Sequence, residues 1–363
     1  MKAIVIGAGP AGLAVAACLA EAGVTVEMLE RSARVGSRWR LHYDRLRLHT
    51  VRGRSGLPML PMPRGTGRYP RRDEVVRYLE DYAAHFDLHP RFGCAVTKVT
   101  RDGNRWRVLH DQGETTADSV IFATGMADLP NLPHWTQDFT GEVLHSSAYR
   151  NPDRFRGRRV LVVGFGNSGG DIALDLAELR VDVAMSVRGP VNILPRELLG
   201  MPITSFGLLS RLLGPGLADR LTAPILRLAV GRPADYALVA AAKGPARQVS
   251  EDGRIPLIDM GTLGAIRAGL IAVRPGVSGV TGQHITFTDG TEADFDAVVA
   301  ATGYRTDLRA MLGDHPALDA EGHPRMSGAG PDGLHFISYH AAADGQLRRI
   351  GIEAREIAKA IAG

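Results

Sequence analysis

Two glycine-rich stretches carry the pattern of residues best suited to chemistry in this chain. Residues 7–12 and 164–169 both read G-x-G-x-x-G, each directly after an apolar, β-branched run and directly before an alanine- and leucine-rich one. In a strand-turn-helix context these glycines allow a tight turn and let the backbone approach a pyrophosphate closely. The N-terminus of the following helix then offers free N–H groups to the phosphates. Two such matches predict two dinucleotide sites.

The residues at the end of the next strand distinguish the two sites. Glu30 lies roughly 20 residues beyond the first pattern, where an acid accepts hydrogen bonds from an adenosine ribose and repels a 2′-phosphate. The corresponding stretch after the second pattern reads Ser186-Val-Arg188, and arginine offers planar, bidentate donors to phosphate oxygens. We therefore predict FAD or NAD at the first site and NADP(H) at the second. A solvated strand end at Glu30 and a solvent-facing Arg188 are the alternatives.

Hydrophobic periodicity predicts the elements that must position these groups. Two βα units of this kind, with further buried strands, are typical of an α/β fold with two Rossmann-like dinucleotide-binding domains. Strands are predicted at 2–7, 24–29, 93–100, 105–109, 119–124, 181–187, 271–280, 284–288 and 295–301, and helices at 11–22, 72–86, 170–179 and 346–362.

Two segments do not follow these periods. Residues 31–72 are rich in arginine, glycine and proline and are predicted to form an ordered meander, since loops this long are usually functional. Residues 197–247 are predicted to form a helical insertion, whose apolar faces pack on the core, line a substrate entrance or touch a membrane surface. The predicted domains are 1–154 for FAD, 155–303 for NADPH and 304–363 as the returning part of the FAD domain.

Bulk composition narrows the class of protein. The chain has 363 residues, 45% of them hydrophobic and 23% charged, which suits two globular domains. The net charge of +4 is spread along the chain without a basic block, so no nucleic-acid partner is expected. No apolar run is long enough for an integral membrane segment, and Met1 leads straight into the first strand, which leaves no room for a signal peptide. We predict a cytoplasmic protein that is a monomer or homodimer.

Several catalytic classes lack the residue patterns they need. The two cysteines do not form C-x-x-C, so dithiol chemistry is not available. No Ser-His-Asp or metal-ligand spacing is recognisable, and no metal is predicted. These absences leave redox chemistry carried by the two dinucleotides.

The motifs together resemble the flavin-containing monooxygenase family, the class B flavoprotein monooxygenases, and within it the plant YUCCA-type branch. The run G-A-G-P-A-G-L-A at 7–14 is similar to the family's FAD motif, F-x-G-x-x-x-H-x-x-x-Y at 139–149 to its identifying sequence, and G-F-G-N-S-G at 164–169 to its NADPH motif. Arg150 stands where Baeyer–Villiger enzymes place tryptophan, which disfavours that class. Runs similar to the YUCCA branch lie at 43–49, 57–63, 78–82, 257–263 and 295–304.

This resemblance implies an NADPH- and FAD-dependent monooxygenase that forms a C4a-hydroperoxyflavin with O2 and oxygenates a small organic substrate. The YUCCA-type reaction would be oxidative decarboxylation of a 2-oxo acid such as indole-3-pyruvate. The alternatives are N- or S-oxygenation of a small secondary metabolite, an NADPH oxidase or flavin reductase without oxygen transfer, and a binding protein without turnover. Residues 50–54 and 339–345 depart from the plant pattern, and both are expected to face the substrate.

The resemblance also carries roles onto particular residues. Asn167 and His49 are the predicted catalytic residues, with His49 either hydrogen-bonding the peroxide or a substrate carboxylate, or only packing against the flavin. His145, in the identifying motif, is expected to be a structural contact between the domains and not a base. The predicted cofactor-binding residues are Gly7, Gly9, Pro10, Ala11, Gly12, Glu30, Arg31, Arg38, Trp39, His49, Thr124, Gly125, Gly164, Gly166, Asn167, Ser168, Gly169, Ser186, Arg188, Thr302, Gly303 and Gln346.

Overall fold

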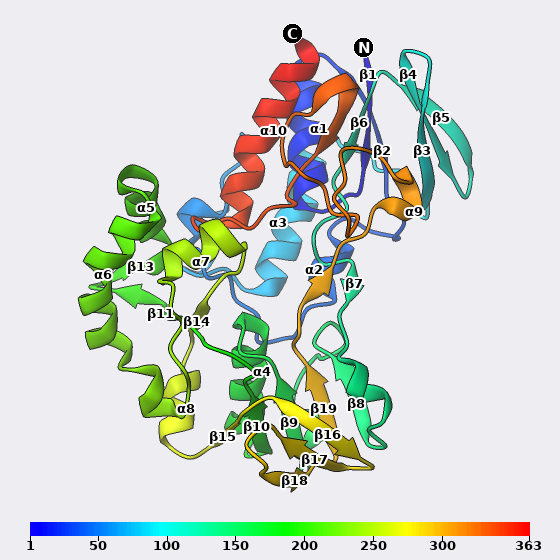
Figure 1. Cartoon of the computed structure of the whole chain (residues 1–363). Coiled ribbons are helices and arrows are strands. Elements are labelled where there is room, and N and C mark those ends of the chain that lie inside the picture. The colour runs from blue at the N-terminus through cyan, green and yellow to red at the C-terminus, as the bar shows by residue number, and fades with distance from the viewer. The chain divides into compact units, whose positions relative to one another are not determined.

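A computed structural model describes residues 1–363, apart from the side chains of Leu208, Leu209 and Arg211. Its contacts group the chain into two compact units (Figure 1). Unit 1 comprises Met1–Arg40, Thr50–Leu129 and Tyr304–Gly363, and unit 2 comprises Leu41–His49 and Pro130–Gly303. Each unit contains a parallel β-sheet with helices packed against it, which confirms the predicted α/β fold class.

Unit 1 is built on a four-stranded parallel sheet in the order β2-β1-β6-β21. Parallel sheets are covered on both faces, so their strands read as continuous apolar runs, as this sheet does. Helices α1 and α10 lie side by side against one another, and α3 contacts α1 (Figure 1). The bounds are β1 (Lys2–Ile6), β2 (Thr25–Leu29), β6 (Ser119–Phe122), β21 (Leu334–Phe336), α1 (Pro10–Glu21), α3 (Arg72–His85) and α10 (Gln346–Ala362).

An antiparallel ribbon completes the core of unit 1. Strands β3 (Val96–Asp102), β4 (Arg105–His110) and β5 (Gly113–Ala117) pair in sequence order. Buried side chains of this ribbon, among them Trp106 and Val108, form one hydrophobic cluster with strand residues of the parallel sheet. The rings of Phe122 and Phe336 stack in this cluster with centroids 5.5 Å apart. The ribbon therefore supports the strands that lead into the first glycine loop.

Unit 2 repeats the plan with a five-stranded parallel sheet in the order β15-β10-β9-β19-β8. A three-stranded antiparallel sheet, β16-β17-β18, shares a second hydrophobic cluster with it. The bounds are β8 (Glu142–His145), β9 (Arg159–Val163), β10 (Asp182–Ser186), β15 (Ile271–Arg274), β19 (Ala297–Ala300), β16 (Val277–Thr281), β17 (His284–Phe287), β18 (Glu292–Asp294), α4 (Asn167–Glu178) and α8 (Thr262–Arg267).

The predicted insertion in unit 2 is confirmed as short helices, which cluster beside two short strands (Figure 1). Its buried side chains Tyr236 and Leu238 pack with Ile193, Leu257 and Leu263 in a small core. No helix among the described residues is both long and apolar enough to cross a bilayer. The bounds are β11 (Ile193–Pro195), β12 (Glu197–Leu198), β13 (Met201–Pro202), β14 (Leu257–Asp259), α5 (Gly207–Leu213), α6 (Pro215–Val230) and α7 (Pro245–Asp252).

The structure corrects one predicted strand and confirms the last helix. The strand expected at 271–280 is wrong as a single element, because β15 and β16 belong to different sheets. Pro275 lies between them and has no N–H to continue a ladder. The helix expected at 346–362 is confirmed at those bounds. The remaining short elements are α2 (Ser37–Arg40), α9 (Arg309–Leu312), β7 (Leu129–Pro130) and β20 (Tyr304–Arg305), with 3-10 turns at Arg52–Arg54, His134–Gln137, Asp153–Phe155, Ile203–Phe206, Pro233–Tyr236 and Pro331–Gly333.

Candidate active site

The first glycine loop joins β1 to α1 and is built so that only one of its glycines faces open space. A Cβ on Gly12 would lie 1.9 Å from the carbonyl oxygen of Gly7, and a Cβ on Gly7 would lie 2.7 Å from that of Ala123. Gly7 also has φ +107°, a conformation that side chains disfavour. A Cβ on Gly9, by contrast, would meet nothing within 4 Å. A pyrophosphate therefore fits beside Gly9.

The second loop, between β9 and α4, repeats this geometry. A Cβ on Gly169 would lie 2.2 Å from the Gly164 carbonyl oxygen, and one on Gly164 2.6 Å from that of Ala301. Gly166 again meets nothing within 4 Å. Each helix begins directly after its middle glycine, so its first-turn N–H groups lie outside the helix's own hydrogen bonds and suit phosphate oxygens. Both loops fit a dinucleotide.

The strand ends beside the two loops differ in charge. The Gly7 N–H donates to the Leu29 carbonyl at 2.8 Å, and the Gly164 N–H donates to that of Ser186 at 3.0 Å. This equivalence places Val187 opposite Glu30, so the acid of the first site is replaced by an apolar residue in the second. The Glu30 carboxylate is held at its loop, because it accepts hydrogen bonds from the N–H groups of Ala8 (2.7 Å) and Ser32 (2.8 Å).

Ser186 and Arg188 flank Val187 and are placed differently. Ser186 is buried, and its hydroxyl donates to the Pro275 carbonyl at 2.8 Å. Arg188 is exposed, and among the described residues none forms an ion pair or a side-chain hydrogen bond with it. Its aliphatic stem lies close to Gly276, where a Cβ would be 3.3 Å from the arginine Cγ. The guanidinium of Arg188 is thus available to an anion, whereas the Ser186 hydroxyl already uses its hydrogen bond on the Pro275 carbonyl.

Further predicted residues gather around the first loop. The Gly36 N–H donates to the Ala8 carbonyl at 3.0 Å, which brings α2 and its residues Arg38 and Trp39 to the loop. The Arg38 guanidinium lies over the Tyr304 ring, 5.3 Å from the centroid, and its buried Nη2 has no hydrogen-bond partner within the described part of the chain. A buried donor without a partner is costly, so this nitrogen suits a polar ligand atom.

The remaining predicted residues of unit 1 lie on strand ends and at a helix start. Thr124 follows β6 and shares a hydrogen bond with the Tyr339 hydroxyl at 2.7 Å. Arg31 pairs with Asp128 at 2.8 Å on the surface. Gln346 begins α10, donates to Ser338 Oγ at 2.9 Å, and keeps a buried Oε1 without a partner among the described atoms. Gly125 of unit 1 and Gly303 of unit 2, which end the two Ala-Thr-Gly runs, both have φ near +80° and open space beside them.

Asn167, a predicted catalytic residue, is held by the run 257–263. Its Oδ1 accepts the Ile258 N–H at 2.8 Å, which orients the side-chain amide and leaves its NH2 group for a ligand. Thr262 donates to the Gly170 carbonyl at 3.1 Å in a buried contact. The run that resembles the YUCCA branch therefore fixes the start of α4. His145 contacts residues of its own unit, with Nε2 2.9 Å from the Gly303 carbonyl oxygen and Nδ1 3.0 Å from Ser147 Oγ, and a structural role for it stays a prediction.

His49, the other predicted catalytic residue, belongs to unit 2 by its contacts. Burial, together with the positive charge of Arg196, lowers its pKa to about 4. The imidazole is therefore neutral at physiological pH. Its Nδ1 is buried and has no hydrogen-bond partner among the described residues. A neutral ring with one unused nitrogen can exchange a hydrogen bond with a ligand but supplies no positive charge.

A buried network on α4 was missed by the sequence analysis. Tyr43 donates to Asp171 Oδ2 and Tyr149 donates to Asp175 Oδ2, both at 2.9 Å, while Arg45 pairs with Glu178. These contacts attach the segment 41–49, which ends at His49, to the helix that follows the second glycine loop. A signal was present, since the two acids are spaced i,i+4 on one helix face and both tyrosines lie in runs already noted.

Replacing Asp171 with asparagine is expected to stabilise the protein at high pH, because the amide still accepts the Tyr43 hydroxyl. Burial raises the pKa of Asp171 to about 6 from its ordinary 3.8. Between these two pKa values the folded state holds a proton that the unfolded state releases, so the free energy of unfolding falls as pH rises from 3.8 to about 6. We expect the free energy of unfolding at pH 8 to rise by about 1–2 kcal/mol in this variant. The gain should roughly halve at pH 5.

Urea unfolding of the FAD-saturated protein at both pH values measures this effect. The control is Asp182→Asn, which removes an exposed acid at the start of β10 and should change little at either pH. A gain for Asp171→Asn that is equal at pH 5 and pH 8 would contradict the burial of a titrating carboxyl.

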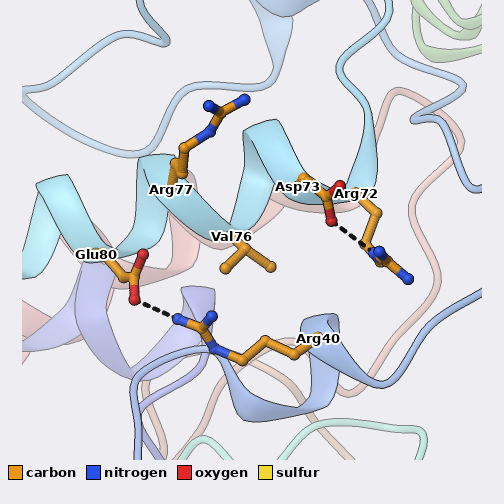
Figure 2. A pocket seen from close by; sticks show the side chains of 6 residues that line it. All are labelled: Arg40, Arg72, Asp73, Val76, Arg77 and Glu80. Atoms are coloured by element: carbon orange, nitrogen blue, oxygen red, sulfur yellow. Dashed lines mark hydrogen bonds and ion pairs between the residues drawn. The ribbon is translucent and has the colours of Figure 1, made fainter. Parts of the chain in front are cut away.

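A hollow beside α2 is dominated by ion pairs. It has a volume of about 470 Å³ and lies between α2 and the start of α3. Arg40 pairs with Glu80, and Arg72 pairs with Asp73 at 2.8 Å (Figure 2). Only Val76 gives it an apolar surface, whereas ligand pockets are mostly apolar with a few polar groups. Its charges are largely satisfied by one another.

Comparisons with known proteins agree with this architecture. The family model for pyridine nucleotide-disulphide oxidoreductases matches residues 4–194. The chain is 39% identical over 351 residues to indole-3-pyruvate monooxygenase YUCCA1 of Oryza sativa subsp. japonica, covering 93% of this chain and 86% of that protein. It is 37% identical over 348 residues to the probable indole-3-pyruvate monooxygenase YUCCA1 of Arabidopsis thaliana, covering 93% and 84%. A solved flavin-containing monooxygenase from Stenotrophomonas maltophilia has 25% identity and a TM-score of 0.75, covering 99% and 97%.

The two parallel sheets, each with a loop that fits a dinucleotide, and the family match define a pyridine-nucleotide-dependent oxidoreductase. Within that class, the chain belongs to the flavin-containing monooxygenase family. The predicted resemblance, the enzyme class and the use of a flavin together with a pyridine nucleotide are thereby confirmed. The protein is a flavin-dependent monooxygenase.

Proposed function

We propose that unit 1 binds FAD, that unit 2 binds NADPH, and that the enzyme oxygenates a small organic acid. The observation that carries the cofactor assignment is the contrast between two otherwise equivalent loops. One is followed by Glu30, which suits a ribose hydroxyl, and the other by Val187 and the unpaired Arg188, which suit a 2′-phosphate. The domain bounds predicted from the sequence, 1–154 and 304–363 for FAD and 155–303 for NADPH, differ from these units at residues 41–49 and 130–154, which the contacts group with unit 2.

In this proposal the bound cofactors supply hydride transfer and dioxygen activation, which no side chain can supply. The residues of the chain bind and orient. The backbone at Gly9 and Gly166 and the N–H groups that start α1 and α4 receive the two pyrophosphates. Glu30 accepts ribose hydroxyls in unit 1, and Arg188 binds the ribose phosphate in unit 2. Ser186 positions the end of β10 through its bond to Pro275.

The proposed catalytic residues act by hydrogen bonding. Asn167 is fixed by Ile258 and presents its NH2 group as a donor. His49 stays neutral above its lowered pKa, so Nδ1 can donate to or accept from the substrate or an oxygen atom without adding charge. Both residues lie in unit 2, and the contact of Tyr43 with Asp171 holds the segment that carries His49.

The proposed reaction is oxidative decarboxylation of a 2-oxo acid such as indole-3-pyruvate. Similarity over most of the chain to two plant proteins named for that substrate supports it. N- or S-oxygenation, and NADPH oxidation without oxygen transfer, are the competing proposals, because the sequence predicts that residues 50–54 and 339–345 depart from the plant pattern and face the substrate. O2 and a small molecule are the proposed reactants, and the cytoplasmic location and monomeric or homodimeric state stay predictions.

Reduction followed by oxygenation separates these proposals. The FAD-loaded enzyme is reduced anaerobically with NADPH and then mixed with O2 and a 2-oxo acid, an amine or a thioether. We expect bleaching of the flavin by NADPH, faster recovery of its absorbance with the 2-oxo acid, and release of CO2 in proportion to NADPH. Stoichiometric hydrogen peroxide with every acceptor would support an oxidase instead. Failure of NADPH to bleach the flavin would contradict the cofactor assignment.

A further inference from the structure

We propose that a pocket of about 410 Å³ in unit 1, distinct from the hollow between α2 and α3, binds the carboxylate and apolar body of the substrate acid. This inference rests on the proposed function, because it names where that acid binds. The pocket is lined by the guanidinium-bearing residues Arg52, Arg54 and Arg348 and by an apolar wall from Leu57 to Pro61. Its ligand is an amphiphilic organic anion.

The charge of this pocket is unbalanced. Arg52 donates to the backbone carbonyls of Arg64 and Thr66, which hold the side chain in place but do not neutralise it. Arg348 pairs with Asp344, yet no acidic residue lines the pocket itself. Among the described residues, Arg54 has no ion-pair or hydrogen-bond partner for its half-buried side chain. In the hollow of Figure 2, by contrast, two of three arginines pair with acids of the lining.

The apolar wall is rigidly held by α3. The Tyr78 hydroxyl accepts the Leu57 N–H at 2.7 Å and donates to the Leu60 carbonyl at 2.5 Å. Tyr82 donates to the Pro58 carbonyl at 3.0 Å. Burial raises the pKa of Tyr78 to about 12, so its proton stays available. The two motifs at 57–63 and 78–82 therefore form one preorganised piece of structure.

The backbone at the tip of this wall is strained. Met59 has φ +66°, in the left-handed region that residues with a Cβ rarely adopt. Its side chain is 37% exposed and lines the pocket. Strain of this kind persists only where the surrounding contacts impose it, and here the hydrogen bonds from Tyr78 and Tyr82 do so. An exposed methionine also adapts to apolar ligands of varied shape.

The segments 50–54 and 339–345 meet beside this pocket. A Cβ on Gly345 would lie 2.6 Å from Thr50 Cγ2, so the C-terminal loop approaches the segment 50–54 closely. Thr50 is fixed in turn by a hydrogen bond to Ser55 at 2.7 Å. One segment supplies Arg52 and Arg54, and the other leads into α10, one turn before Arg348. The contact between these two segments thus brings the three arginines to one pocket.

These features select one class of ligand. The volume lies within the range of about 300–1,000 Å³ usual for small-molecule sites. An unpaired guanidinium binds a carboxylate through two parallel N–H···O bonds, and the apolar wall accepts an aryl or alkyl group. A small inorganic anion would satisfy the arginines but leave the wall in water. A neutral molecule of the same shape would leave the arginines without their charge partner.

Equilibrium binding to the FAD-loaded protein tests the inference. Calorimetry is carried out with indole-3-propionate, an aryl carboxylate that lacks the reacting carbonyl, and with indole-3-propionamide, its neutral counterpart. We expect the acid to bind wild type at least tenfold more tightly than the amide. Arg54→Gln should weaken acid binding about tenfold and leave amide binding unchanged. Arg54→Lys, which keeps the charge without the fork, should lie between them.

The matched control is Arg64→Gln, which removes an exposed arginine of the same loop outside the pocket and should retain wild-type binding. Visible spectra of each variant confirm bound flavin. Equal binding of acid and amide, equal losses in Arg54→Gln and Arg64→Gln, or full displacement by equimolar inorganic phosphate would each overturn the inference. If Arg54→Gln binds the acid as tightly as wild type and still forms product, the pocket inference is contradicted but the proposed function is not. If acid binding depends on Arg54 but NADPH does not reduce the flavin, the proposed function is contradicted but the pocket inference is not.

Discussion

Replacing Gly169 with alanine is expected to leave a protein that keeps FAD but is no longer reduced by NADPH. The added Cβ would lie 2.2 Å from the Gly164 carbonyl oxygen, and both atoms belong to backbone that cannot rotate away. Helix α4 must then move from β9, which displaces the N–H groups that start the helix. Misplacement of about 1 Å in a binding site costs roughly 100-fold in rate, and we expect at least that loss in flavin reduction.

Anaerobic stopped-flow reduction at fixed NADPH measures the loss, and the visible spectrum reports FAD content. Gly264→Ala is the control, because a Cβ on this exposed glycine of α8 meets nothing within 4 Å. It should be reduced normally and gain about 0.5–1 kcal/mol of stability, as alanine in a helix does. Near-normal reduction of the Gly169→Ala enzyme would show that NADPH does not bind this loop.

The glycine loops were predictable because their chemistry is local. Gly7 and Gly164 each need a left-handed turn after a strand, and Gly12 and Gly169 each face the carbonyl that precedes them by five residues. Such constraints leave a fixed spacing in the sequence. The strand, turn and helix around them also have periodicities that a short window contains, which is why the fold class followed from the sequence.

Contacts between distant segments left a weaker trace. Tyr43 meets Asp171 across 128 positions, and no local pattern specifies that pair. The short strand β21 pairs with β6 in the sheet of unit 1, although the two strands lie far apart in the sequence. Pro275 ended a predicted strand early because the choice of sheet depends on partners elsewhere in the chain. The pocket of Arg54 and Arg348 likewise exists only once the segment after His49 meets α10.

Ser186 shows a further limit of residue-type reasoning. A hydroxyl near Arg188 suits a phosphate, but the Ser186 side chain is buried and its hydroxyl donates a hydrogen bond to the Pro275 carbonyl. The same residue type can bind a ligand or fix a loop, and only its surroundings decide. We therefore propose that the discrimination between NADPH and NADH in this chain depends on Arg188.

Substitution of Arg188 by alanine is expected to weaken NADPH binding about 10- to 100-fold and NADH binding by less than about threefold. The guanidinium is exposed and has no partner among the described residues, so its loss disturbs no other contact. Hydrogen bonds to charged groups contribute about 1.5–3 kcal/mol, which corresponds to that range of dissociation constants. Both constants are obtained from the NADPH and NADH dependence of anaerobic flavin reduction.

Arg274, on the neighbouring strand, provides a control. The Val187 N–H donates to the Arg274 carbonyl, and the Arg274 guanidinium lies 5.9 Å from the Phe287 ring centroid. Because this guanidinium packs on an aromatic ring, Arg274→Ala should retain most of the preference for NADPH. If Arg188→Ala raised both dissociation constants equally, the residue would serve the loop as a whole and not the phosphate. A preference that followed Arg274 instead would move the phosphate site to the end of β15. Only a loss confined to NADPH and to Arg188 supports a phosphate site formed by Arg188, one residue beyond the position equivalent to Glu30.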